Sequence, residues 1–181
     1  MRANRRREAA EAARRLHRME PVLARLHAVQ AQLDYRGRDF VTATAQIEAS
    51  LGRRPAGSAS HYLLAVSYGH LNQLDRALEE LGKANLLPEI DSSTRGWLYG
   101  AAGRTAEANV ALASCRQAGG DCLMALIGLG RHEEALLALQ AAFQTRSPVL
   151  LNLRSEPRFD PLRGDPRFAD LERRVGFPAQ P

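Results

Sequence analysis

The sequence has only two cysteines and one tryptophan, and it has no long apolar run. Two thiols, Cys115 and Cys122, are too few for a disulfide-dense scaffold or a four-cysteine zinc site. No stretch approaches the roughly 18 consecutive apolar residues of a membrane-spanning helix, and the N-terminus has no compact apolar segment like that of a secretory signal. We therefore expect a globular protein in the reducing cytoplasm, without a membrane span.

Motifs for catalysis and cofactor binding are also missing. The five histidines are spread along the chain, and there is no H-E-x-x-H, glycine-rich phosphate loop or G-x-S-x-G. The neighbouring Glu133 and Glu134 look like a catalytic carboxylate pair, but they lie where a turn leads into a helix, and acids favour a helix N-terminus. We expect a noncatalytic protein with no cofactor and no metal site.

Lysine is nearly absent, since 24 of the 25 basic residues are arginine and only Lys83 is lysine. The net charge is +5, and residues 1–18, with seven arginines and two glutamates, carry all of it. Attraction to nucleic acid would have to come from this segment, which has no aromatic residues for base stacking. We expect a basic helix over 1–20 whose arginines face solvent; nucleic-acid contact, disorder and an acidic partner are the alternatives.

Alanines recur at the spacing of a helical repeat. Ala9, Ala43 and Ala77 are 34 residues apart, and each is followed four residues later by an apolar residue and about twelve later by a proline. Shorter units follow, with reference alanines Ala108 and Ala135. Tight turns are expected between helices at 72–73, 103–104 and 130–131, and caps at 91–93 and at Asp121. No segment alternates with period two, so the sequence predicts an all-α fold.

This repeat resembles the tetratricopeptide repeat (TPR), a 34-residue helix-turn-helix with the pattern W-x2-L-G-x2-Y, then A-x3-F, then P. In residues 61–88 the matching positions are Leu64, Tyr68, Ala77, Leu81 and Pro88, whereas His61 replaces the tryptophan and Ala65 the glycine. The resemblance implies a right-handed α-α superhelix with repeats over 21–147. Cys115 falls at a small buried position of its repeat and is expected as a packed thiol; a disulfide with Cys122 or a redox role is the alternative.

The segment SPVLLNLRSEPRFDPLRGDPRFADLERRVGFP resembles the ending of many bacterial TPR proteins. Two Asp-Pro steps, at 160–161 and 165–166, predict two helix starts, the second helix running over about 166–174. Five arginines of this C-terminal segment are expected to face water: Arg158, Arg163, Arg167, Arg173 and Arg174. We interpret 148–181 as a helical cap on the last repeat; direct ligand binding by Phe159 or Arg167 is the alternative.

A TPR stack binds protein or peptide partners on its concave face, which the first helix of each pair lines. With Leu64, Ala65 and Tyr68 turned into the pair, the sequence predicts a partner-binding groove lined by Tyr62, Val66, Gly69, His70 and Trp97. Met124 is a candidate for the corresponding position in a later unit. In the alternative, Trp97 packs against a neighbouring helix and Tyr62 is ordinary surface.

Residues 5–19 fit the second helix of a repeat whose first helix is missing. Such a half repeat implies either a longer protein or an apolar face, at Met19 and Val22, that another molecule such as a second copy covers. In the bacterial proteins that the tail resembles, the arrays commonly follow a DNA-binding, kinase or cyclase domain. A sensory or regulatory portion of a transcriptional or signalling protein is therefore the second functional hypothesis.

Overall fold

The computed structural model describes residues 26–51 and 57–176, and these residues form helices and no strand. Residues 26–36 are helical. The further elements are α2 (Phe40–Leu51), α3 (Ser58–His70), α4 (Leu74–Lys83), α5 (Pro88–Ala101), α6 (Thr105–Gln117), α7 (Leu123–Gly128), α8 (His132–Gln144), the 3₁₀ helices η1 (Pro148–Asn152) and η2 (Pro157–Leu162), and α9 (Pro166–Arg174). The predicted all-α class is confirmed for the described residues.

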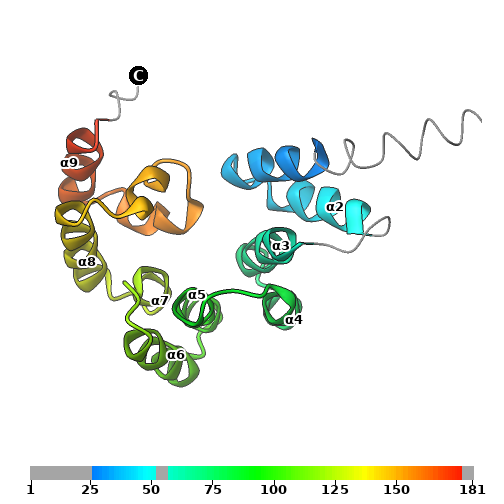
Figure 1. Ribbon diagram of the computed structural model, residues 1–181, viewed down its shortest axis with the longest axis horizontal. Coiled ribbons are helices and arrows are strands. Elements are labelled where there is room, and N and C mark those ends of the chain that lie inside the picture. The colour runs from blue at the N-terminus through cyan, green and yellow to red at the C-terminus, as the bar shows by residue number, and fades with distance from the viewer. Residues whose placement is uncertain (1–25, 52–56, 177–181) are drawn as a thin grey trace, which may run out of the picture.

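The helices pack mainly against their neighbours in the chain, as in a row of hairpins. The pairs α3–α4 and α5–α6 are in close contact, and α7 lies against both α5 and α8. The row curves, and the segment with η1 and η2 lies on the inner side of the curve (Figure 1). The finer predictions, a right-handed superhelix and TPR identity, stay predictions.

Left-handed backbone residues make the predicted turns between the hairpin helices. Asn72 has φ 60°, Gly103 74° and Gly130 70°, one in each of the three turns. A residue in this conformation stops a helix and reverses the chain within a few residues, and glycine adopts it without a steric penalty. All three predicted turns are confirmed.

Small residues lie where the helices cross. The described reference alanines of the repeat, Ala43, Ala77, Ala108 and Ala135, are all fully buried. Gly128 on α7 lies so close to α5 that a Cβ atom there would be 2.5 Å from Cα of Trp97. These short side chains let neighbouring helices approach closely, so a larger side chain would separate them. Ala9 lies outside the described residues, as do the whole of segment 1–20, Met19 and Val22.

The C-terminal segment completes the core at the end of the row. Leu150, Phe159, Leu162, Phe168 and Leu171 pack with the buried side chains of α7 and α8. Asp165 accepts a hydrogen bond from the backbone N–H of Arg167 at 2.8 Å, and α9 ends just before Gly176, which has φ 91°. The helix over 166–174 is therefore confirmed.

Two predicted helix starts are wrong. Pro161 lies inside η2, which begins earlier at Pro157, where the Glu156 side chain accepts a hydrogen bond from the N–H of Arg158. Residues 91–93 lie within α5, which begins at Pro88. Proline is favoured at the first position of a helix, so the helix starts there and not at Asp91. The Asp121 cap is confirmed: its carboxylate accepts a hydrogen bond from the N–H of Leu123 at 3.1 Å.

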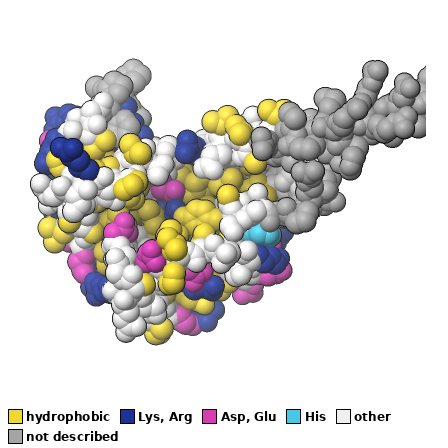
Figure 2. Space-filling view, in the orientation of Figure 1, with side chains coloured by type: hydrophobic (Ala, Val, Ile, Leu, Met, Phe, Trp, Pro, Cys, Tyr) yellow, Lys and Arg dark blue, Asp and Glu magenta, His cyan; other side chains and the backbone are white. Residues whose placement is uncertain are grey.

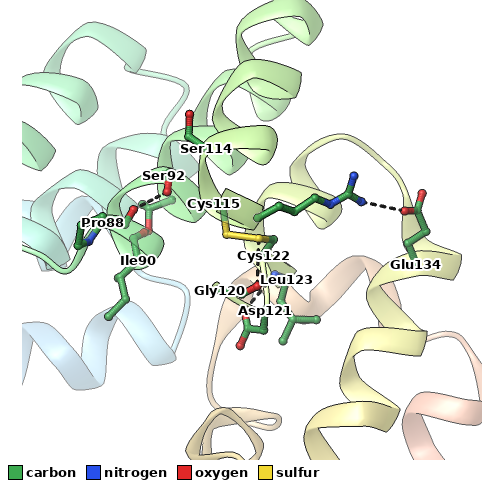
Figure 3. Close-up of a disulfide and its surroundings, with 12 residues drawn as sticks. Pro88, Ile90, Ser92, Ser114, Cys115, Gly120, Asp121, Cys122, Leu123 and Glu134 are labelled. Atoms are coloured by element: carbon green, nitrogen blue, oxygen red, sulfur yellow. Dashed lines mark hydrogen bonds and ion pairs between the residues drawn. A yellow bond between two sulfur atoms is a disulfide. The ribbon is translucent and has the colours of Figure 1, made fainter. Parts of the chain in front are cut away.

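Cys115 and Cys122 form a disulfide, so the expected packed thiol is wrong (Figure 3). Cys115 is in α6, and Cys122 precedes α7 with φ 56°. A Cβ atom on Gly120, between them, would lie 2.9 Å from the sulfur of Cys115 and 2.8 Å from Cβ of Glu89. The bridge thus closes the α6–α7 connection, and Gly120 within this connection packs closely against Glu89 at the start of α5. Disulfides persist in oxidising compartments, whereas cytoplasmic thiols are kept reduced, so the bridge and the expected cytoplasmic location favour different environments.

Candidate binding cavity

A cavity of about 490 Å³ lies between the helical segment 26–36, α3, α5, the α6–α7 connection and the C-terminal segment. Figure 2 shows hydrophobic side chains, with acidic and basic ones among them, on the inner side of the curve. Ile90, Met124 and Val149 supply apolar wall, whereas Ser93, Glu156 and Arg158 supply polar groups. Most of the lining residues are polar or charged and a smaller part is apolar, and the volume lies in the range of small-ligand sites, so the cavity is a candidate binding site.

Arg158 is the central charged group of the cavity and is only 4% exposed. Its Nε donates to Oε1 of Glu156 at 2.8 Å, and its Nη2 donates to Oε2 of Glu156 at 3.1 Å and to the hydroxyl of Tyr62 at 2.8 Å. The guanidinium carbon lies 5.6 Å from the ring centres of both Tyr62 and Trp97. The prediction that Arg158 faces water is therefore wrong, because η2 turns it inward onto an aromatic floor.

Glu156 compensates this buried charge. Burial alone would raise its pKa, but the charge and hydrogen bonds of Arg158, with the hydrogen bond from Tyr35, lower the pKa of Glu156 to about 2. Burial raises the pKa of Tyr35 well above its ordinary value. The pair Glu156–Arg158 is therefore ionised and Tyr35 is a neutral donor throughout the physiological range, and a buried ion pair of this kind fixes geometry more than it adds stability.

Two buried polar groups that line the cavity have no hydrogen-bond partner among the described residues. They are Nη1 of Arg158 and the hydroxyl of Ser93, a residue only 7% exposed. Buried polar groups in folded proteins are nearly always paired, so an unpaired donor at a cavity wall is an available ligand contact. The neighbouring Ser92 differs, because its hydroxyl donates to the carbonyl of Pro88.

The residues predicted for partner binding are brought together, but mostly beneath the surface. Tyr62 lines the cavity, and Met124 does too. Val66 is 1% and Trp97 5% exposed, so neither offers surface to a partner in this state, and Trp97 packs between helices as the alternative held. His70 stacks on Phe40 with ring centres 4.1 Å apart. Phe159 is buried in the core and also lines the cavity, whereas Arg167 pairs with Glu133 at 2.7 Å and does not line it.

The remaining cavity residues were missed by the sequence analysis. Arg158 is expected at the surface because it alternates with acids along the chain, and the sequence analysis does not single out Glu156. The one available signal is Glu156-Pro157, an acid before a first-turn proline, which marks a helix start but does not show that the two side chains are buried. Ser93 gave no signal, because nothing in its neighbours distinguishes it from Ser92.

The described part of the chain holds no group of three or more His, Cys, Asp or Glu side chains placed to bind a metal ion. None of its helices is long and apolar enough to cross a membrane. Comparisons with protein-family models, curated proteins and solved structures found no match to this chain.

Proposed function

We propose that the protein is a noncatalytic binding module of TPR type, which takes a peptide or a segment of a partner protein at the cavity on the inner side of its helices. The cavity itself is the observation that carries the proposal. It has an apolar wall, an aromatic side chain at Tyr62 and unpaired hydrogen-bond donors, and these are the features that anchor a peptide in a pocket.

The proposed binding surface is narrower than the groove expected from the sequence. Tyr62 and Met124 line the cavity and are its direct contacts. Val66 and Trp97 belong to the core cluster against which Tyr62 packs, and the rings of His70 and Trp97 are 4.9 Å apart, so on this proposal these three residues lie outside the contact surface. The C-terminal segment contributes Arg158 and Glu156, so on this proposal it is part of the binding site as well as a cap.

A sensory or regulatory portion of a bacterial signalling protein is the second candidate function. The cavity volume of about 490 Å³ favours it, because a site of this size also suits a small effector. On either proposal the protein binds a ligand at the cavity and catalyses no reaction. A cytoplasmic location would suit such a regulator, provided that the disulfide is formed and retained there.

A peptide-display library panned on the purified protein tests the proposal. Enriched peptides are cross-linked from a photoreactive amino acid placed either at Met124, in the cavity wall, or at Val110, which is 69% exposed on α6. We expect cross-links from position 124 and none from position 110. An absence of enriched peptides, or cross-linking from position 110 alone, contradicts a peptide site in the cavity.

A further inference from the structure

Polar groups follow one another along the face of α5 that borders the cavity. Glu89, Ser93 and Trp97 follow one another at intervals of four residues on this helix, so they share one face. Each is about 6 Å further along the helix axis than the one before. Arg158 lies over the Trp97 ring, and Ser93 is one turn before it. The floor thus presents a carboxylate, a hydroxyl and a guanidinium in that order.

The donor end has two groups that lack acceptors. Nη1 of Arg158 and the hydroxyl of Ser93 are buried and unpaired within the described residues, and both residues line the cavity. Arg158 already makes a bidentate pair with Glu156, so Nη1 is the side of the fork that remains for a ligand. A carboxylate is the acceptor that best fits an arginine edge with a neighbouring hydroxyl.

The opposite end is acidic. Glu89 has no ion-pair or hydrogen-bond partner among the described residues, and it is half-buried against Gly120, with Asp121 next along the cavity wall. The formal charge of the five charged side chains that line the cavity is −1, which disfavours a phosphate or another multiply charged anion. These five side chains are Arg36, Glu89, Asp121, Glu156 and Arg158.

We infer that the cavity binds a zwitterion of the amino-acid type, either a free amino acid or a short peptide with both ends free. Its carboxylate accepts hydrogen bonds from Nη1 of Arg158 and the hydroxyl of Ser93, and its ammonium group lies against Glu89 and Asp121. Ile90, Met124 and Val149 form an apolar wall for an aliphatic side chain. This inference rests on the proposed binding function and specifies the ligand chemistry of the same site.

Isothermal titration calorimetry with L-leucine and leucyl-leucine tests the inference and separates the two sources of the ligand. Each probe is also titrated as its N-acetyl derivative, which lacks the ammonium charge, and as its C-terminal amide, which lacks the carboxylate. We expect one of the two zwitterions to bind and each blocked form to bind at least ~10-fold more weakly. Equal binding of a blocked form overturns the corresponding half of the site and with it the inference.

Matched variants locate the binding. Ser93→Ala should weaken binding about 5- to 10-fold, whereas Ser92→Ala should leave it unchanged, because the Ser92 hydroxyl is already paired and does not line the cavity. Glu89→Gln should weaken binding by a similar factor, and Glu79→Gln, a change at a side chain 67% exposed on α4, should not. Equal effects within either pair overturn the placement.

The outcome also distinguishes this inference from the broader proposal. If neither zwitterion binds but library peptides cross-link from position 124, the ligand chemistry is wrong and the binding function stands. If the zwitterion binds and no peptide is selected, the cavity is a small-molecule site and the protein-partner function is wrong.

Discussion

Tyr35 and Glu156 are 121 positions apart in the chain, and the Tyr35 hydroxyl donates a hydrogen bond to Oε1 of Glu156 at 2.6 Å. Nearby, Nε of Arg38 donates to Asp160 at 2.7 Å. Both contacts join the first described helix and its following turn to η2. The C-terminal segment therefore has contacts on two sides. It packs against the buried side chains of α7 and α8, and it forms hydrogen bonds with Tyr35 and Arg38, which precede α2.

Tyr35→Phe removes the hydroxyl and leaves the ring in place. We expect the free energy of unfolding to fall by about 1 to 3 kcal/mol, because the acceptor is a buried, ionised carboxylate. Urea denaturation followed by circular dichroism measures this. Tyr99→Phe, on the half-exposed side of α5, is the control and should change stability by less than ~0.5 kcal/mol. Equal effects of both changes would mean that the Tyr35 contact does not join the two parts.

Arg158→Met should destabilise the protein by about 3 to 5 kcal/mol, because it leaves the carboxylate of Glu156 buried without its partner. The double variant Arg158→Met with Glu156→Met removes both charges and should recover most of that loss. A thermodynamic cycle of the two single and one double variant by chemical denaturation gives the coupling. Additive losses would show that the two side chains act independently and that the pair is not buried as described.

Stability should depend on pH through His70. Burial, followed by the charge of Arg158, lowers the pKa of His70 from 6.5 to about 4, while Glu156 and Asp160 act in the opposite direction. The unfolded chain therefore takes up this proton at a higher pH than the folded chain. The contribution of His70 to the free energy of unfolding is fully present above pH 6.5. It is lost as the pH drops towards 4, and the loss is up to about 3 kcal/mol.

The range from pH 6.5 to 5 isolates this histidine, because the lowered pKa of Glu156 affects stability only below its ordinary value of 4.5. His70→Phe keeps the stack on Phe40 and should flatten the pH dependence in this range. Unfolding free energies at several pH values measure the slope. A variant with the same slope as the unmodified protein would place the responsible proton elsewhere.

Removing the disulfide with Cys115→Ala and Cys122→Ala should lower the free energy of unfolding by about 2 to 3 kcal/mol, the range for closing a loop this short. The unmodified protein should lose a similar amount in reductant, and the double variant should lose nothing further. Alkylation with and without prior reduction, read by mass spectrometry, reports the bridge directly. Two thiols alkylated in the untreated folded protein would contradict it.

Gly128→Ala should destabilise by about 2 kcal/mol or more, since its Cβ would meet the Trp97 backbone at 2.5 to 2.7 Å and force α7 away from α5. Gly164→Ala is the matched control, because a Cβ atom there meets open space at an ordinary backbone angle. Thermal melting of both variants gives the comparison. Similar melting temperatures would show that α5 and α7 are less closely packed than described.

The helices and turns could be predicted from the sequence because they depend on residues close together in the chain. Alanine spacing identified buried crossing positions such as Ala77 and Ala108, and glycine or asparagine identified the turns. The fold-back of the C-terminal segment could not be found in this way. It depends on contacts between residues more than 90 positions apart, such as Arg158 with Tyr62, and no local pattern encodes which distant surface a short helix will cover. For the same reason the groove predicted from the sequence includes residues of α3, α5 and α7 but not Arg158.

In a row of repeats that touch only their neighbours, the outermost hairpins can open while the middle stays folded. Here the residues around Tyr35 and Arg38 hold those around Glu156 and Asp160, so the beginning and the end of the described row depend on each other. Neither margin can loosen alone. The protein should consequently melt in one cooperative transition, with the amides near both margins exchanging at a common rate.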